Sequence, residues 1–243
     1  IDEWLAQYPP ILELPRVECE GMATPFPLAG LELCSANARM SSLVDALECG
    51  VRHFQITFPS YMEVKDHERN AYEGRLLALK IAEMMRRLRY QHLAYLRSGL
   101  CFSMRTPPHL VCAFTDIRKA LTSNNVSLHC WLLDARGAKD AEVAACWERM
   151  SRAKSAGEVK VVGLFGGGAG ALSAAQGVRG GATVSIFAQE SYLGRRQEDG
   201  DSRMLAKFRK AGGTVMLHNV YGPQQSLLTT PAIENEAEQL GIS

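Results

Sequence analysis

The feature that most limits the possible folds of this sequence is a repeated alternation of short strand-like runs with helix-like segments. Between successive runs, apolar residues recur at helical spacing, as do Leu77, Ile81 and Met84, and a similar pattern follows the last run. A short helix is predicted near 115–123, with Thr115 as its N-cap. Strict alternation is typical of a parallel sheet with helical crossovers. The predicted strands are 28–33, 51–56, 100–104, 126–133, 159–165, 183–188 and 214–220.

Two architectures satisfy this alternation: an open, doubly wound sheet and a (β/α)8 barrel. In both, the loops that follow the strands carry any chemistry. Only seven strands are predicted, whereas the barrel requires eight. The proline-containing stretch 1–24 is expected to be an irregular N-terminal extension, and 25–243 is expected to form one domain.

Composition narrows the class of protein further. The chain has 243 residues, a net charge of +1 and 47% hydrophobic residues, so no global field favours a nucleic acid or an anionic membrane as partner. No apolar run approaches the roughly 20 residues that span a bilayer. The seven cysteines are scattered, without a CxxC motif or a preceding signal-peptide pattern, which predicts reduced thiols in an intracellular protein of cytoplasm or mitochondrion. The histidines lack metal-ligand spacing, so no metal site is expected.

A glycine-rich stretch, "GGGAGA" at 166–171, follows the fifth predicted strand and opens a helix. Gly166, Gly168 and Ala171 fit the G-x-G-x-x-A pattern, and Glu190 lies at the end of the next strand, where a ribose-binding acid is expected. Such glycines let a backbone approach a pyrophosphate at a helix N-terminus. The alternative is a flexible loop in a segment rich in glycine and alanine, because the dinucleotide fingerprint usually follows the first strand of its fold.

Seven stretches, read in order, resemble those of the aldo-keto reductases. The resemblance covers about residues 25–243 and favours a (β/α)8 barrel of the aldo-keto reductase type, apparently lacking its eighth strand, over the doubly wound sheet. The stretches are "PFPLAGLEL", "ALECGVRHFQIT", "GLCFSMR", "DIRKALTSNNVSLHCWLL", "CWERMSRAKSAGEVKVVGLFG", "AGGTVMLHNVYGPQQSLLTTP" and "AIENEAEQLGIS".

The resemblance also implies a chemistry that can be checked position by position. Members of that family reduce carbonyls with NADPH, using a tyrosine as proton donor, a lysine that lowers its pKa, an aspartate that holds the lysine and a histidine that orients the substrate. The aspartate falls on Gln55, the lysine on Arg105 and the histidine on Leu132. The tyrosine falls on Ser60, with Tyr61 one residue later. An amide has no charge and an arginine is not a tunable ammonium, so at least three of the four roles are lost.

The cofactor positions implied by the resemblance are also altered. The residues that bind the nicotinamide amide fall on Phe165, Gly166 and Ile186, and the stacking residue falls near Gln189. The family's adenosine-phosphate contacts follow an eighth strand, which is not predicted here. We therefore expect no NADPH binding in the manner of that family, and no other cofactor.

Three functional hypotheses follow from the sequence. The first is a catalytically inactive aldo-keto reductase-like protein that acts as a structural or regulatory subunit of a larger assembly, with other protein subunits packing near 28–33 and 214–220. The second is an atypical NADPH-dependent carbonyl oxidoreductase that uses Tyr61 with Arg105. The third is a dinucleotide-binding protein that uses the loop 166–171. Arg52 and His53 are expected to be structural residues at a strand end.

Overall fold

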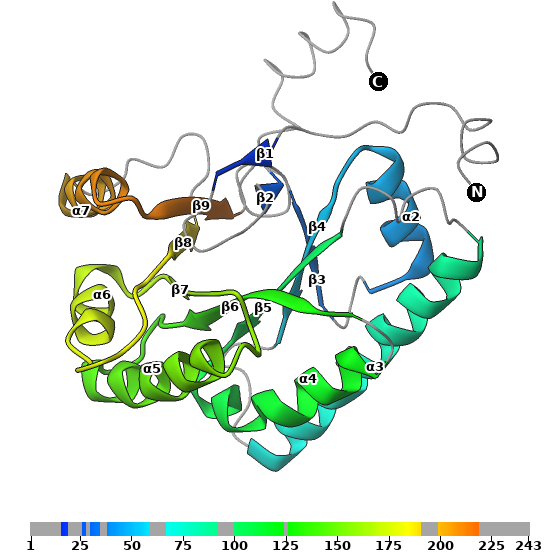
Figure 1. The fold of residues 1–243 in the computed structure, drawn as a ribbon, viewed down its shortest axis with the longest axis horizontal. Helices are drawn as coiled ribbons and strands as arrows, with labels where there is room; N and C mark the ends of the chain where they lie inside the picture. Colours follow the sequence, from blue (N-terminus) through cyan, green and yellow to red (C-terminus); the bar gives the residue numbers. More distant parts are fainter. Residues whose placement is uncertain are drawn as a thin grey trace, which may run out of the picture.

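The sheet at the centre of the molecule has seven parallel strands that neighbour one another in sequence order (Figure 1). The computed structural model of the protein describes residues 16–18, 26–27, 30–34, 38–58, 67–91, 100–123, 126–190 and 199–218. Each of the seven strands overlaps a predicted run, and four of them extend one or two residues past its end. They are β3 (Gly30–Leu33), β4 (His53–Thr57), β5 (Cys101–Thr106), β6 (Leu128–Asp134), β7 (Val161–Phe165), β8 (Ile186–Glu190) and β9 (Thr214–His218).

Helices lie along the outer face of this curled sheet (Figure 1). Their bounds are α2 (Met40–Glu48), α3 (His67–Gln91), the 3-10 helix η2 (Pro108–Ala113), α4 (Phe114–Thr122), α5 (Asp140–Ser155), α6 (Gly168–Gln176) and α7 (Asp199–Lys210). The prediction that Thr115 caps α4 is wrong. The chain enters α4 directly from η2, so Ala113 holds the cap position without any side-chain hydrogen bond. Pro108 starts η2 because its fixed φ suits the first turn of a helix.

The strands separate two apolar layers. Side chains alternate between the two faces of a strand, so neighbouring residues belong to different layers. Trp131 of β6 lies in the outer layer, stacked on Phe114 with 3.7 Å between ring centroids. Leu132, the next residue, lies in the inner layer, which fills the interior of the curled sheet. The inner layer consists of Phe26, Cys101, Cys130, Leu132, Val161, Phe165, Ile186 and Ala188.

A short antiparallel hairpin, β1 (Arg16–Val17) with β2 (Phe26–Pro27), carries Phe26 into the inner layer. The Phe26 ring meets the His53 ring edge-on, with centroids 4.5 Å apart. Because His53 begins β4, the hairpin lies at the amino end of the interior. The pairing places a strand within the stretch 1–24, which was expected to be irregular, and it joins residues on both sides of that boundary.

The strand order decides between the two architectures. A doubly wound sheet reverses its order at a switch point, whereas β3 to β9 run without reversal, so the alternative of a doubly wound sheet is wrong. Within the described ranges β3 and β9 remain the two edges of the sheet, which makes the structure an incomplete (β/α)8 barrel. No helix in the described part of the chain combines the length and hydropathy required to cross a bilayer.

Candidate functional site

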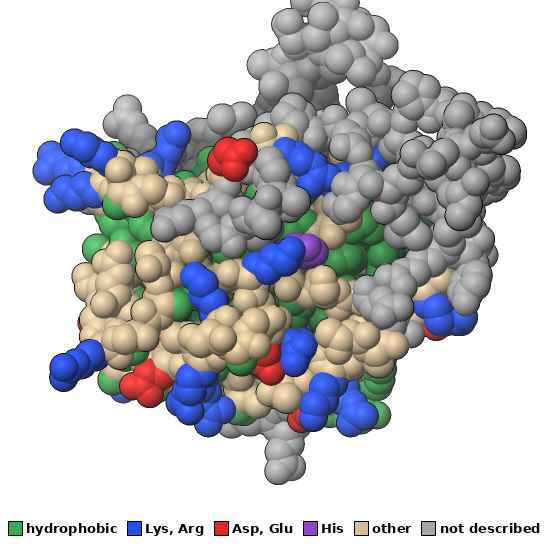
Figure 2. Space-filling model, viewed as in Figure 1, with side chains coloured by type: hydrophobic (Ala, Val, Ile, Leu, Met, Phe, Trp, Pro, Cys, Tyr) green, Lys and Arg blue, Asp and Glu red, His purple; other side chains and the backbone are tan. Residues whose placement is uncertain are grey.

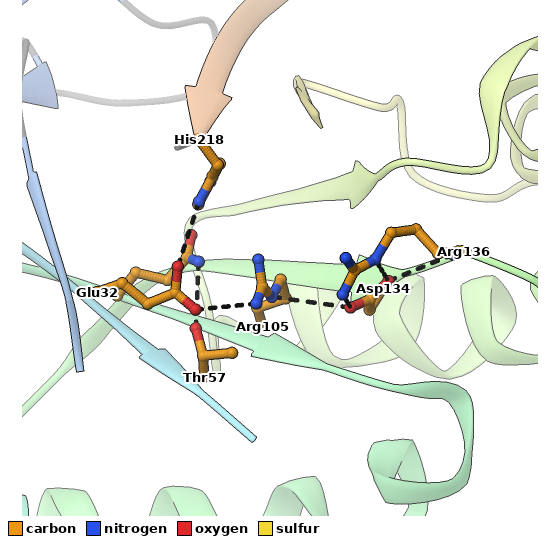
Figure 3. Close-up of polar contacts among 7 residues, drawn as sticks. Glu32, Thr57, Arg105, Asp134, Arg136 and His218 are labelled. Carbon is orange, nitrogen blue, oxygen red and sulfur yellow. Dashed lines mark hydrogen bonds and ion pairs between the residues drawn. The ribbon is translucent and has the colours of Figure 1, made fainter. Parts of the chain in front are cut away.

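Polar and charged side chains, with Arg105 and Asp134 buried among them, gather at the carboxyl end of the barrel, the end at which barrels of this kind carry their chemistry (Figure 3). They come from strands that are far apart in sequence but meet in the barrel. We call this group the mouth cluster. Its members are Glu32 of β3, Thr57 of β4, Arg105 of β5, Asp134 of β6, Arg136 just after β6, and His218 of β9.

Arg105 lies at the centre of the mouth cluster. One guanidinium nitrogen donates a hydrogen bond to Glu32 Oε1 at 2.9 Å. Its Nε lies 3.8 Å from Asp134 Oδ2, so the same cation faces carboxylates on both sides. The Arg105 side chain is only 9% exposed, and a guanidinium so deeply buried requires such partners.

Asp134 is held by a second arginine. Arg136 grips its carboxylate with two hydrogen bonds, at 2.9 Å and 2.7 Å, a fork geometry that lysine cannot supply. The guanidinium carbons of Arg105 and Arg136 lie 4.1 Å and 4.7 Å from the centroid of the Phe165 ring. Phe165 is fully buried, and its ring attracts both cations, of which Arg105 is buried and Arg136 is exposed at 39%.

Glu32 links the first and last described strands of the barrel. Its Oε2 lies 3.6 Å from Nδ1 of His218, and Thr57 also hydrogen-bonds to this carboxylate. Burial raises the pKa of Glu32, but hydrogen bonds from His218 and Thr57 and the charge of Arg105 outweigh it and lower the pKa to about 2. Glu32 is therefore a carboxylate at neutral pH and cannot serve as a proton donor there.

The structure brings three of the predicted tetrad positions together. Gln55, Arg105 and Leu132 lie on the neighbouring strands β4, β5 and β6, and Arg105 is in register with Leu132. Gln55 is 2% exposed and donates from Nε2 to Thr57 Oγ1 at 3.3 Å, while its Oε1 has no partner among the described residues. Leu132 is fully buried in the inner layer. Ser60 and Tyr61 lie outside the described residues.

Arg52 and His53 have structural partners, as the sequence suggested. Arg52 is 1% exposed and donates to the carbonyl oxygens of Leu47 and Val51. His53 Nε2 lies 2.7 Å from Ser103 Oγ inside the barrel. Burial, with smaller contributions from His218 and His129, lowers the pKa of His53 to about 3, so the ring is neutral at physiological pH.

Several solved structures resemble this barrel over nearly the whole chain. A reductase described as an aldo/keto reductase from Brucella melitensis superposes with a TM-score of 0.66 at 15% identity, covering 94% of this chain and 80% of that one. The barrel of this chain has the aldo-keto reductase fold. The apo form of Gox0644 gives a TM-score of 0.65 at 14% identity, covering 95% of this chain and 76% of its own.

The aldose reductase of Schistosoma japonicum superposes with a TM-score of 0.61 at 17% identity, covering 93% of this chain and 75% of that one. No protein-family model matches the sequence, and no curated protein matches it either. The likeness is thus one of fold.

The residues at the predicted nicotinamide positions do not fit a carboxamide. Phe165 and Ile186 are fully buried and apolar, and Gly166 has no side chain to donate or accept a hydrogen bond. A Cβ placed on Gly166 would lie 2.5 Å from Cγ of Arg136, so the arginine stem already packs against this backbone. Only Gln189, which is half-buried, carries a polar side chain among these four positions.

The glycine-rich loop has the backbone of a tight strand-to-helix turn. Gly166, Gly167 and Gly168 all have positive φ, at 67°, 75° and 59°. A carboxylate oxygen of Asp140 lies 3.3 Å from where a Cβ on Gly170 would sit, which puts negative charge beside the first turn of α6. That charge disfavours a pyrophosphate at this helix end. Glu190 ends β8, and its side chain lies outside the described part of the structure.

Sequence reasoning found Arg105 but missed its partners. Glu32, Asp134, Arg136 and His218 were not singled out, although three of them occupy the inward-facing strand positions. The alternation along the strand offered a signal for Asp134, which follows Leu132 by two residues, whereas the register of Glu32 with Gln55 is seen only in the folded sheet. Within the described residues no group of three or more histidine, cysteine, aspartate or glutamate side chains is placed to hold a metal ion.

Proposed function

We propose that this protein is a catalytically inactive barrel of the aldo-keto reductase fold that serves as a structural or regulatory subunit of a protein assembly. The observation that carries the proposal is the closed ionic arrangement around Arg105. A reductase site needs a cation whose proton can shift toward a tyrosine, and a guanidinium stays protonated at any pH the enzyme meets.

The carboxylates around Arg105 support the same proposal. In the chemistry implied by the fold, the cation is held by an acid at the position of Gln55, which is a neutral amide here. Instead the acids come from the neighbouring strands, Glu32 on one side and Asp134 on the other. The positive charge of Arg105 is thus still balanced by carboxylates. The acid–cation pair that would tune a proton donor is absent, as expected where a site has become a structural one.

The edges of the sheet suggest where a partner packs. β3 and β9 have no further strand beside them within the described residues, and Leu217 of β9 is 48% exposed. An open edge of this kind is a template for another chain. We therefore place other protein subunits near 28–33 and 214–220, the two edges of the incomplete barrel.

Measurements of NADPH binding and of carbonyl reduction test the proposal that the protein is catalytically inactive. The purified protein is titrated with NADPH, with nicotinamide fluorescence and the shift in melting temperature as readouts, and is assayed with a panel of aldehydes and ketones. No stabilisation and no turnover are expected. Steady turnover that disappears in Tyr61→Phe would replace the proposal with the second hypothesis, an oxidoreductase that uses Tyr61 with Arg105.

Native mass spectrometry of the protein isolated from its own cells tests the assembly. A complex with other protein chains and without nicotinamide is expected. A monomer at cellular concentration would contradict the subunit role, and a bound dinucleotide would favour the loop at 166–171.

A further inference from the structure

Exposed apolar side chains are concentrated on one line of α3. Among the described residues four large hydrophobic side chains are exposed: Tyr72 at 63%, Leu76 at 46%, Leu79 at 40% and Leu217 at 48%. Three of these four belong to α3, the 25-residue helix at the outer rim of the barrel (Figure 1). We call Tyr72, Leu76 and Leu79 the α3 stripe.

The α3 stripe is separate from the face that packs on the barrel. At 100° per residue, its three side chains fall within roughly 60° of one another around the helix axis. Ile81, Met85 and Leu88 of the same helix are buried in the outer apolar layer and lie on the opposite side. A surface helix normally has one apolar stripe, and α3 has two, of which the second faces solvent.

Positive charge flanks the α3 stripe. Arg75 and Lys80 are exposed on either side of it, and Arg86 and Arg87 continue the two flanks about two turns beyond Leu79. Glu83, a partly exposed acid in line with the stripe, binds Arg86 at 2.7 Å and Arg87 at 2.9 Å and so offsets part of their charge, which leaves Arg75 and Lys80 as the main cations on the two borders. The surface is therefore an apolar ridge between cationic borders.

We propose that the α3 stripe docks an amphipathic helix of a partner protein, with apolar residues on one face and aspartate or glutamate on both sides of that face. A helix with i, i+3 or i+4 apolar spacing matches the ridge, as when two helices pack side by side. Acidic flanks complement Arg75 and Lys80 on the two borders and raise the rate of association. A second copy of this chain does not fit, because two α3 stripes would bring like charges together.

The other positively charged surface of the barrel lacks the apolar ridge. Basic side chains gather over α7 in Figure 2, and Arg203, Lys207, Arg209 and Lys210 of that helix are exposed. The large apolar residues Leu205 and Phe208 of α7 are buried, so this helix offers charge without an apolar anchor. An exposed position on α7, Ala206, is therefore a matched control for α3.

Site-specific photo-crosslinking in the native cell tests the proposal. A photoreactive amino acid replaces Leu76 in one form of the full chain and Ala206 in another, and the crosslinked peptide is mapped by mass spectrometry. An adduct from position 76 that is absent from 206, with a mapped peptide that carries acidic residues around helically spaced apolar residues, is the expected result.

Two sets of substitutions make the test specific to the chemistry proposed. The adduct is expected to fall about tenfold when Tyr72 and Leu79 are changed to serine, and by a similar factor for Arg75→Glu with Lys80→Glu. These residues are exposed, so folding is expected to be unchanged, which circular dichroism checks. An adduct that survives both sets overturns the proposal. So does an adduct with a second copy, with a lipid or with a peptide lacking acidic residues, and so does the absence of any adduct at 76.

The inference rests on the proposed role as a subunit, but the two can fail separately. A complex seen by native mass spectrometry without a crosslink from position 76 would leave the subunit role standing and remove the α3 stripe from it. A crosslink at 76 in a protein that oxidises NADPH with steady turnover would support docking at the α3 stripe and contradict the catalytically inactive state.

Discussion

At the scale of single residues, the barrel contains polar groups whose protonation depends on burial. His53 is enclosed by the hairpin and bonded to Ser103, and its pKa is lowered to about 3. The unfolded chain exposes the ring, whose pKa then returns to about 6.5. Between these two pKa values the unfolded state binds one proton more than the folded state, so the free energy of unfolding rises with pH through this window. Above the window His53 causes no further change in stability.

The variant His53→Gln is expected to make stability less dependent on pH. Between about pH 7.5 and pH 5, the lowered pKa of His53 costs the wild type about 2 kcal/mol of unfolding free energy, and glutamine does not titrate. Urea denaturation at the two pH values measures the difference. Glu32 does not interfere, because its own window lies between about 2 and 4.5. An unchanged pH dependence in the variant would show that His53 is not kept neutral by burial.

At the scale of elements, the turn from β7 into α6 is fixed by steric contact as well as by backbone conformation. Gly167 caps α6 with φ at 75°. A Cβ at this position would lie 2.6 Å from Cβ of Ala171 and 2.9 Å from Cβ of Ala135. Gly180 has a similar φ of 69° and open space around it. The two glycines thus share a conformation and differ in packing.

Gly167→Ala is expected to destabilise the protein more than Gly180→Ala does. Both alanines meet the cost of a left-handed backbone, about 1 kcal/mol, and only the first also overlaps its neighbours. The overlap adds about 1 to 3 kcal/mol, the usual range for an overpacked site. Urea denaturation of the two variants gives the difference directly. Equal losses would mean that the β7–α6 turn can shift without disturbing Ala135.

Sequence patterns predicted which helices and strands are present more accurately than they predicted the residues at which these elements begin and end. The seven strands were predictable because alternating and continuous apolar runs, such as "SLHCWLL", follow from burial on both faces of the sheet. The start of α4 was missed because a 3-10 turn precedes it, and no side-chain cap marks the boundary. Arg105 and Gln55 were found through their places in family-like motifs, whereas His218 and Glu32 meet only in the folded barrel, which no local spacing encodes.

At the scale of the whole molecule, the described residues leave the barrel open between β3 and β9. Adjacent strands lie about 4.8 Å apart, so one missing strand leaves edges about 10 Å apart. The contact between Glu32 and His218 shows that long side chains from the two edges reach each other at the carboxyl end. The opening in the described structure is thus compatible with a single strand.

Hydrogen exchange is expected to show these edges as the weakest part of the sheet. In the isolated protein, amides of 30–33 and 214–218 should exchange at least about tenfold faster than those of β5, β6 and β7, since edge strands are hydrogen-bonded on one side only. In the native assembly the same amides should gain protection. Equal protection in the monomer and the assembly would show that the edges are not where the partner packs.

The sequential order of the strands has a consequence for how the chain is made. Every strand from β4 to β9 pairs with the strand synthesised just before it, so the sheet can lengthen as the chain leaves the ribosome. The mouth cluster cannot form strand by strand in this way. Arg105 can meet Glu32 and Asp134 early, but His218 is among the last described residues to emerge, 186 positions after Glu32 (218 − 32). The pairing of Glu32 with His218 therefore forms only once all seven strands of the sheet are in place, and a chain that stops before His218 leaves that carboxylate without its imidazole partner.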